Sequence, residues 1–288
     1  MKAWATLLTQ PDYLVGVRVL DASLRRHGTE HPFVVMVTSD IDEPTRESLR
    51  DEGFLVRELP SLRPDDSLET HYANARFAEV WTKLGAWNLT EFERLVVLDA
   101  DMLAVAGMDE LFSMDLPEGA PAACHACRCN PNRIPSYPAS WRPENCFYTY
   151  CRGVDHTQEP DAVDNYFNGG FLVIEPDRAV YDALVERLDD LDDLAGYQFA
   201  EQDFLNEFFA GRWLPVPYVY NALKTLHHQH PQMWDAAEVK NLHYIIDKPW
   251  QGRTEPGSRY HELHELWWEV AERDVLTAAT PVGGTPRG

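Results

Sequence analysis

Positive charge is scarce in this chain. Its 288 residues hold 25 lysines and arginines against 47 aspartates and glutamates, which gives a formal net charge of −22 at pH 7. Such a charge repels nucleic acids and anionic membranes, so we expect neither as a partner. It also repels nucleotides, so any phosphate-binding site requires a cation or local basic side chains. We interpret the excess of acidic side chains mainly as a feature that keeps the protein soluble.

Long apolar runs are missing as well. No segment approaches the roughly 20 consecutive apolar residues that span a bilayer. The first nine residues turn polar too soon for a secretory signal. We therefore expect a cytoplasmic protein. The 44% of hydrophobic residues suffice for one large core or two small ones.

The common glycine-rich phosphate motifs are also absent. No Gly-x-Gly-x-x-Gly follows the first predicted strand, and no Gly-x-x-x-x-Gly-Lys-[Ser/Thr] occurs anywhere. If the chain binds a nucleotide, it must hold the phosphates by other means.

The five cysteines are an odd number, and Cys124, Cys127 and Cys129 lie close together. Cys124 and Cys127, with Cys146 and Cys151, could hold zinc or form disulfides. Four residues separate the second pair, and no secretory signal is present, so we favour free thiols in a reducing compartment. A zinc scaffold remains the alternative, and it predicts bound zinc.

Apolar runs and helical periods alternate along the chain, which predicts an α/β fold with a parallel sheet and right-handed crossovers. Strands are expected at residues 4–8, 33–38, 54–56, 94–98, 171–174 and 239–245, and helices at 12–27, 44–52, 73–89, 177–194, 201–209 and 259–274.

Residues 115–165 interrupt this pattern with prolines, aromatics and the cysteines. Long irregular stretches inside a compact domain are usually functional, so we interpret this insert as a lid or acceptor wall. We expect one domain over residues 1–276. Residues 277–288, rich in Thr, Pro and Gly, are predicted to be disordered.

The apolar run at residues 94–98 ends in Asp99-Ala100-Asp101. A buried strand that ends in two carboxylates requires a partner for them, and a hard divalent cation is a suitable one. In open α/β sheets, ligands bind at the carboxyl ends of the strands. The alternative interpretation is an ordinary Asp-rich turn.

Further motifs follow in a fixed order along the chain. They are Thr82-Lys83-Leu84, Asp99-Ala100-Asp101, Phe167-Asn168-Gly169-Gly170, the string Phe-Ala-Glu-Gln-Asp-Phe-Leu-Asn at residues 199–206, Val219-Tyr220-Asn221, and His243 with Lys248-Pro249-Trp250. In this order, over about residues 3–275, the chain resembles the family-8 retaining glycosyltransferases, which include glycogenin and plant galactinol synthase. The string at 199–206 is most similar to galactinol synthases, whereas the acidic motif has the glycogenin-like form.

The resemblance implies a single GT-A domain with a Rossmann-like, mostly parallel sheet flanked by helices. It implies a UDP-sugar donor bound through Mn²⁺, with Mg²⁺ as an alternative. Asp99, Asp101 and His243 would be the metal ligands, a set of oxygen and nitrogen donors that suits manganese.

The same resemblance implies the donor site. Lys83 would bridge the diphosphate and the sugar, Lys248 would clamp the phosphates, and Arg76 would face the donor. The remaining donor contacts would come from Leu7, Thr9, Tyr13, Ala100, Asn168 and Gly169. Each assignment has a purely structural alternative. The lysines would be ordinary solvated side chains, Leu7, Thr9 and Tyr13 would pack at a strand end, and Asn168-Gly169 would form a tight turn.

Gln202 falls where the family places a polar group beside the anomeric carbon, next to Glu201. The family is usually described by front-face attack with the leaving phosphate as base. Glu201 and Asp203 keep a covalent intermediate open. As an alternative role, these carboxylates complement a helix dipole.

Two departures from the relatives matter. The segment at residues 222–231 has no tyrosine, so self-glucosylation there is not expected. The loop between His243 and Lys248 is short and lacks glycine.

We therefore predict a retaining hexosyltransferase that moves glucose or galactose from UDP-glucose or UDP-galactose to a small polyol or sugar, with an inositol-type acceptor as first choice. A glycogenin-like glucan primer and a catalytically silent UDP-sugar-binding module are the alternatives. A homodimer is compatible with the sequence, which does not fix the sugar or the acceptor.

Overall fold

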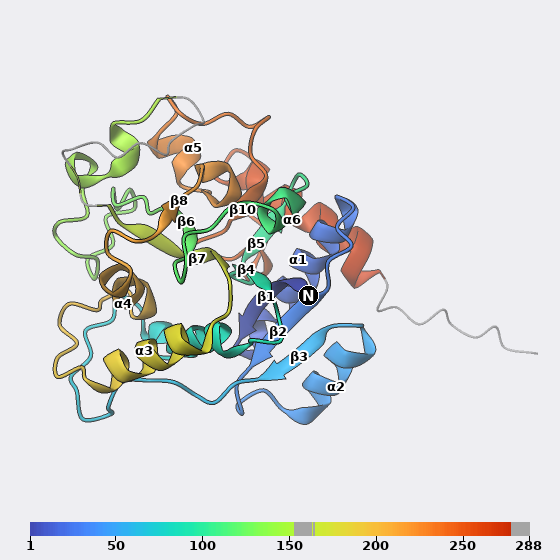
Figure 1. The fold of residues 1–288 in the computed structure, drawn as a ribbon. Coiled ribbons are helices and arrows are strands. Elements are labelled where there is room, and N and C mark those ends of the chain that lie inside the picture. Colours follow the sequence, from blue (N-terminus) through green and yellow to red (C-terminus); the bar gives the residue numbers. More distant parts are fainter. Residues whose placement is uncertain (153–162, 164, 278–288) are drawn as a thin grey trace, which may run out of the picture.

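The computed structural model describes residues 1–152, 163 and 165–277. Its centre is a seven-stranded sheet with the strand order β3-β2-β1-β4-β7-β6-β8, beside a three-stranded sheet with the order β5-β10-β9 (Figure 1). The strands are β1 (Lys2–Leu8), β2 (Phe33–Val37), β3 (Leu55–Glu58), β4 (Arg94–Leu98), β5 (Met102–Ala104), β6 (Ala122–His125), β7 (Phe167–Ile174), β8 (Leu214–Pro215), β9 (Ala222–Leu223) and β10 (Asn241–His243).

The helices flank the central sheet, as expected for an α/β fold. The α-helices are α1 (Leu14–Arg26), α2 (Glu43–Asp51), α3 (Arg178–Asp189), α4 (Glu201–Phe208), α5 (Leu226–Gln229) and α6 (His261–Val270). Short 3-10 helices occupy Pro11–Tyr13, Ala75–Ala78, Val80–Asn88, Asp109–Phe112, Pro143–Asn145, Phe147–Thr149, Tyr218–Tyr220 and Pro249–Gln251.

The parallel half of the sheet follows directly from the sequence. β1 pairs in parallel with both β2 and β4, and β2 pairs in parallel with β3. Every residue of β2 and β4 is buried, which explains why both strands are apolar apart from Arg94 at the start of β4. β7 is antiparallel to β4 and β6, so the sheet is mostly, not entirely, parallel.

The two faces of the sheet bury separate cores. On one face, Ala5 and Val97 pack with Leu184 of α3 and Leu205 of α4. On the other face, alternate strand residues such as Trp4 pack with α1 and α2. A third core joins α1 and α6 to the three-stranded sheet and to the cysteine-bearing insert.

The helix predicted over residues 73–89 is the main error in the expected elements. The structure has two 3-10 helices here instead, Ala75–Ala78 and Val80–Asn88. Trp81 to Trp87 are buried without interruption, so the core surrounds this segment on all sides. Packing, rather than helix propensity, therefore sets its winding.

Two other expectations change. The Asn168-Gly169-Gly170 segment is no turn before a strand but lies within β7. The insert at residues 115–165 is not irregular throughout, because it supplies β6 to the central sheet.

The last helix ends as an α-helix at Val270 and continues as a π-helix over Ala271–Leu276. Of the predicted disordered tail, residues 278–288 lie outside the described residues.

Within the described part of the chain, no helix has the length and apolar character needed to cross a bilayer. The cytoplasmic location and the homodimer stay predictions.

Candidate active site

The site forms where β4 ends and the chain crosses to the smaller sheet. Asp99 follows β4, and its backbone N–H donates to the carbonyl of Gly170 at 2.8 Å. The chain then enters β5, which pairs antiparallel with β10 and places His243 opposite Met102. The backbone N–H of Tyr244 donates to the carbonyl of Asp101 at 2.8 Å. Sheet pairing therefore brings His243 to the acidic motif.

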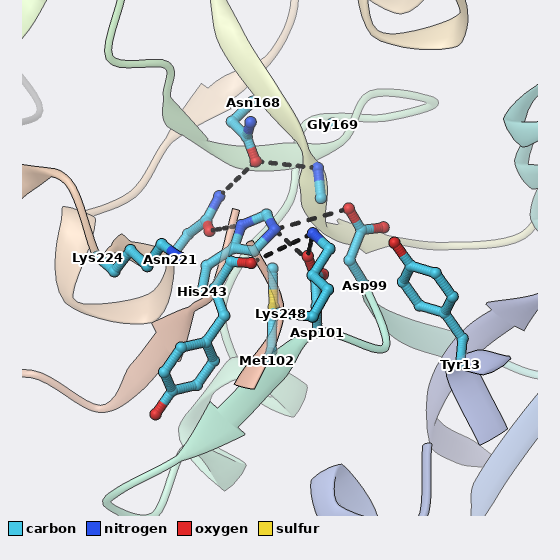
Figure 2. A network of polar contacts seen from close by, with 12 residues as sticks. Tyr13, Asp99, Asp101, Met102, Asn168, Gly169, Asn221, Lys224, His243 and Lys248 are labelled. Atoms are coloured by element: carbon cyan, nitrogen blue, oxygen red, sulfur yellow. Dashed lines mark hydrogen bonds and ion pairs between the residues drawn. The ribbon is translucent and has the colours of Figure 1, made fainter. Parts of the chain in front are cut away.

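Asp99, Asp101 and His243 converge on one point (Figure 2). Each offers one ligand atom, and these atoms lie within 4.8 Å of one another. Nε2 of His243 is 3.3 Å from Oδ1 of Asp101 and 3.8 Å from Oδ2 of Asp99. Asp101 and His243 are buried, whereas Asp99 is partly open.

Asn221 fixes the orientation of the His243 ring. Its Oδ1 lies 2.8 Å from Nδ1 of His243, and its Nδ2 donates to Oδ1 of Asn168 at 2.9 Å (Figure 2). A carbonyl oxygen at Nδ1 selects the tautomer that leaves Nε2 free to bind a metal. Asn221 lies in the Val219-Tyr220-Asn221 motif, but the sequence alone gave no indication of this role.

Gly170 provides the space behind this triad. A Cβ at this position would lie 2.6 Å from Cε1 of His243 and 2.7 Å from Oδ2 of Asp99. No side chain larger than hydrogen fits there, which gives the Gly-Gly motif a physical reason beyond turn formation.

Lys83 links the acidic motif to α4. Its Nζ is 2.8 Å from Oδ1 of Asp99 and 2.9 Å from Oε1 of Glu201, and it donates to the carbonyl of Gly169 at 3.1 Å. Burial alone would lower the pKa of Lys83, but the two carboxylates raise it above its ordinary value. Burial raises the pKa of Glu201 to about 7, against the opposing effect of Lys83.

Lys248 makes the second cationic contact of the site. Its Nζ pairs with Oδ2 of Asp101 and donates to the carbonyl of Tyr244 at 3.2 Å. Burial by itself would raise the pKa of Asp101, yet Lys248 and His243 together hold it well below the usual range. Ile246, in the glycine-free loop before Lys248, has a φ of 70°, a strained conformation for a β-branched residue.

Gln202 is held rigidly at the start of α4. Its Oε1 accepts from Nδ2 of Asn168 at 3.0 Å and from the backbone N–H of Gly169 at 2.9 Å. Its Nε2 donates to the hydroxyl of Tyr166 at 2.9 Å, and that hydroxyl donates to Asp203. Tyr166 also belongs to the site. It was not predicted, because a single tyrosine in the sequence carries no signal of such a role.

These side chains surround a cavity of about 580 Å³. Of the residues predicted for the site, the cavity is lined by Leu7, Thr9, Tyr13, Arg76, Lys83, Asp99, Ala100, Asp101, Asn168, Glu201, Gln202, His243 and Lys248. Gly169 is not among the lining residues; it contributes its backbone groups to Lys83 and Gln202.

Arg76 lies against Tyr13 at one end of the cavity. Its Nη1 donates to the Tyr13 hydroxyl at 3.0 Å, and its Cζ is 5.4 Å from the centre of the tyrosine ring. Lys248 reaches the same ring, with Nζ at 5.9 Å from its centre.

An aromatic group made of two insert residues and Phe199, which lies just before α4, also lines the cavity. The rings of Trp141 and Phe199 stack with centres 4.2 Å apart, and Tyr137 contacts Phe199 edge-on at 4.9 Å. An acceptor wall was predicted for this insert, but the sequence alone did not single out these side chains.

The cysteine set considered from the sequence is wrong in two of its four members. All five cysteines are buried and form no disulfide in the described residues. Cys124 donates to the carbonyl of Pro217, and Cys151 to that of Phe147. Cys129 and His230 take their places beside Cys127 and Cys146.

The α/β fold carries a cavity lined in part by Asp99, Asp101 and His243, and comparison with known proteins shows the family. The model of glycosyl transferase family 8 matches residues 5–254, so the chain belongs to that family of enzymes. The chain is 33% identical to galactinol synthase 7 of Arabidopsis thaliana over 283 residues, covering 96% of this chain and 83% of that protein. Galactinol synthase 1 of Ajuga reptans is 30% identical over 288 residues, covering 96% and 82%.

Solved structures share the fold. An active-site mutant of LgtC matches with a TM-score of 0.62 and 20% identity, covering 94% of this chain and 95% of that one. The glycosyltransferase GlyE of Streptococcus pneumoniae matches with a TM-score of 0.60 and 17% identity, covering 94% of this chain and 60% of that one. The expected GT-A-like α/β fold is therefore confirmed.

Proposed function

We propose that this enzyme is a retaining hexosyltransferase that moves glucose or galactose from a UDP-sugar to a small polyol or sugar. The single observation that carries the proposal is the convergence of Asp99, Asp101, His243, Lys83 and Lys248 on one cavity. The identity to galactinol synthases over nearly the whole chain supports a small polyol acceptor.

Asp99, Asp101 and His243 would hold the divalent cation, Mn²⁺ or Mg²⁺. Their fit to a metal rests on the oriented Nε2 of His243, on two carboxylates beside it, and on Gly170, which leaves that space open. When bound, the ion neutralises the diphosphate as it leaves.

The basic residues supply what the acidic chain otherwise lacks. Lys83 is buried and Lys248 is half-buried, and the present partners of both ammonium groups are the site carboxylates. On the donor side they bind phosphate oxygens and the sugar, and Arg76 adds a third cation beside Tyr13. Tyr13, with Leu7, Thr9 and Ala100, forms the uridine end of the cavity.

Gln202 and Glu201 are the side chains we assign to the reacting carbon. The amide of Gln202 is oriented by Asn168, Gly169 and Tyr166, so it presents a fixed dipole. Glu201 is ion-paired with Lys83 and 5% exposed. This arrangement suits electrostatic support of front-face attack, because a nucleophilic carboxylate would have to leave its ion pair.

The aromatic group formed by Tyr137, Trp141 and Phe199 is assigned to the acceptor. Aromatic faces pack against the C–H surface of a sugar or cyclitol and leave its hydroxyl groups to polar neighbours. Tyr137 and Trp141 belong to the insert and Phe199 lies just before α4, and all three line the cavity.

The test is a screen of UDP-glucose and UDP-galactose against myo-inositol and other small acceptors, with Mn²⁺ and with Mg²⁺. We expect UDP release that depends on acceptor and metal, with retention of the anomeric configuration. A screen without any UDP release would refute the transferase assignment. Intact-mass analysis of the protein after incubation separates a glucan primer, because only a primer gains hexose mass.

A matched variant addresses the metal site. Asp101→Asn keeps the shape of the side chain but removes its charge, so we expect loss of activity with an unchanged circular dichroism spectrum. Glu110→Gln changes a carboxylate that is paired with Lys240 and does not line the cavity, and it serves as the control with retained activity. Full activity in Asp101→Asn would contradict the metal role.

A further inference from the structure

A second group of metal-binding side chains lies outside the triad described above. It comprises the Sγ atoms of Cys127, Cys129 and Cys146 and Nε2 of His230, all buried and within 4.8 Å of one another. The cysteines belong to the insert, whereas His230 follows α5 and is 84 residues beyond Cys146. Only folding brings these residues together, and Figure 1 shows α5 beside the insert.

The distances fit the tetrahedron of a single zinc ion. Nε2 of His230 is 3.5 Å from the sulfur of Cys127, 3.2 Å from that of Cys129 and 3.5 Å from that of Cys146. The sulfurs of Cys127 and Cys146 are 3.9 Å apart. With Zn–S of about 2.3 Å and Zn–N of about 2.1 Å, a regular tetrahedron has S···N of about 3.6 Å and S···S of about 3.8 Å.

The imidazole is held for such a role. The side-chain amide of Gln232 lies 3.5 Å from Nδ1 of His230 and also donates to the carbonyl of Tyr148 at 3.2 Å. The backbone N–H of His230 donates to the carbonyl of Leu226 at 2.8 Å. Nε2 of His230 therefore points at the three sulfurs.

We propose that Cys127, Cys129, Cys146 and His230 bind a structural Zn²⁺ ion. Three thiolates and one imidazole are a closed ligand set typical of structural zinc. Such a set leaves no position for substrate, so the ion stabilises structure and takes no part in the reaction. An iron–sulfur cluster spreads its ligands over two or more iron atoms and does not suit four ligand atoms this close.

The ion would fix the insert to α5 next to the active site. Cys127 lines the cavity, and the chain between Cys129 and Cys146 carries Tyr137 and Trp141 of the aromatic group. A metal at this point closes the base of that loop, so it would hold the aromatic wall in place. The zinc site itself does not depend on the proposed sugar transfer.

The experiment is metal analysis of the full-length protein, purified without added metal or chelator. We expect one zinc ion per chain by mass spectrometry. Cys129→Ser and His230→Gln should lose it, while the matched controls Cys124→Ser and Cys151→Ser, at buried cysteines outside the cluster, should keep it. Asp101→Asn should also keep it, which separates this site from the triad. Absence of zinc from the wild type, zinc retained in both ligand variants, or a Cys127–Cys146 disulfide by peptide mapping would overturn the proposal.

A second measurement needs only the wild-type protein, so it tests the ligand set even where the variants fail to fold. In wild-type protein loaded with Co²⁺ in place of zinc, three thiolates and one imidazole predict intense visible bands of tetrahedral cobalt and a strong thiolate charge-transfer band. Thiol titration with a mercurial should release the metal in proportion to the thiols that react. Only weak octahedral cobalt bands, or metal release without thiol consumption, would contradict the ligand set.

Discussion

Oδ1 of Asn221 lies 2.8 Å from Nδ1 of His243, and this contact decides which ring nitrogen faces Asp99 and Asp101. The partner of a metal-binding histidine commonly contributes 10- to 100-fold to metal affinity. We therefore expect Asn221→Leu to raise the Mn²⁺ concentration for half-maximal activity by about 10-fold or more. Asn221→Asp, which keeps an acceptor at this position, should be affected less. Direct Mn²⁺ binding by electron paramagnetic resonance checks the result independently of turnover, and unchanged affinity in the leucine variant would contradict it.

Lys83 is the only cation in contact with both Asp99 and Glu201 among the ion pairs of the described residues. Lys83→Met leaves the buried Glu201 carboxylate without its partner, so we expect a loss of about 3 kcal/mol in the free energy of unfolding. We also expect at least ~100-fold lower kcat, because a cation is removed from the proposed transition state.

The double variant Lys83→Met/Glu201→Leu separates these two effects. Replacing both members of a buried pair with apolar groups should recover most of the stability in urea unfolding, while activity stays low. A double variant as unstable as the single one would show that the ion pair is not the cause.

Trp141 stacks on Phe199 in the cavity wall, with ring planes inclined by 18°. We expect Trp141→Ala to raise the KM for the acceptor by about 10-fold, equivalent to about 1.4 kcal/mol of binding. The KM for the UDP-sugar should not change, and Trp141→Phe should give an intermediate value. An effect on the donor KM alone would contradict the assignment of the aromatic group to the acceptor.

His264 makes stability depend on pH. It is buried beside Lys224, with Nε2 3.3 Å from Nζ, and burial lowers its pKa from 6.5 to about 4. As the pH falls below 6.5, His264 binds a proton in the unfolded chain but stays neutral in the folded chain. Stability is therefore full above pH 6.5 and is lost toward pH 4, by up to about 3 kcal/mol from this group.

Thermal unfolding between pH 7.5 and pH 4.5 measures this effect. His264→Gln can still accept from Lys224 but does not titrate, so its melting temperature should fall less steeply over that interval than that of the wild type. Other groups titrate equally in both proteins, and the difference between the two curves isolates His264. Parallel curves would contradict the assignment.

The sequence by itself determined those features of this enzyme that depend on residues close together along the chain. Largely apolar runs identified β1, β2 and β4, because strands buried on both faces need such runs. The run into Asp99 and Asp101 located the carboxyl edge of the sheet, and the order of motifs indicated the family. The helix expected at residues 73–89 is wrong: two 3-10 helices stand there instead, and the core encloses the part from Trp81 to Trp87.

Tertiary structure alone decided the contacts between distant residues. His243 reaches the acidic motif through the pairing of β10 with β5, and Asn221 orients it from a separate segment. The four members of the cysteine cluster are likewise set by packing: spacing suggested Cys124 and Cys151, but their side chains point to other partners, while His230 arrives from α5. Spacing along a chain limits only local geometry, and ligands from separate elements meet only when the core that joins those elements is formed.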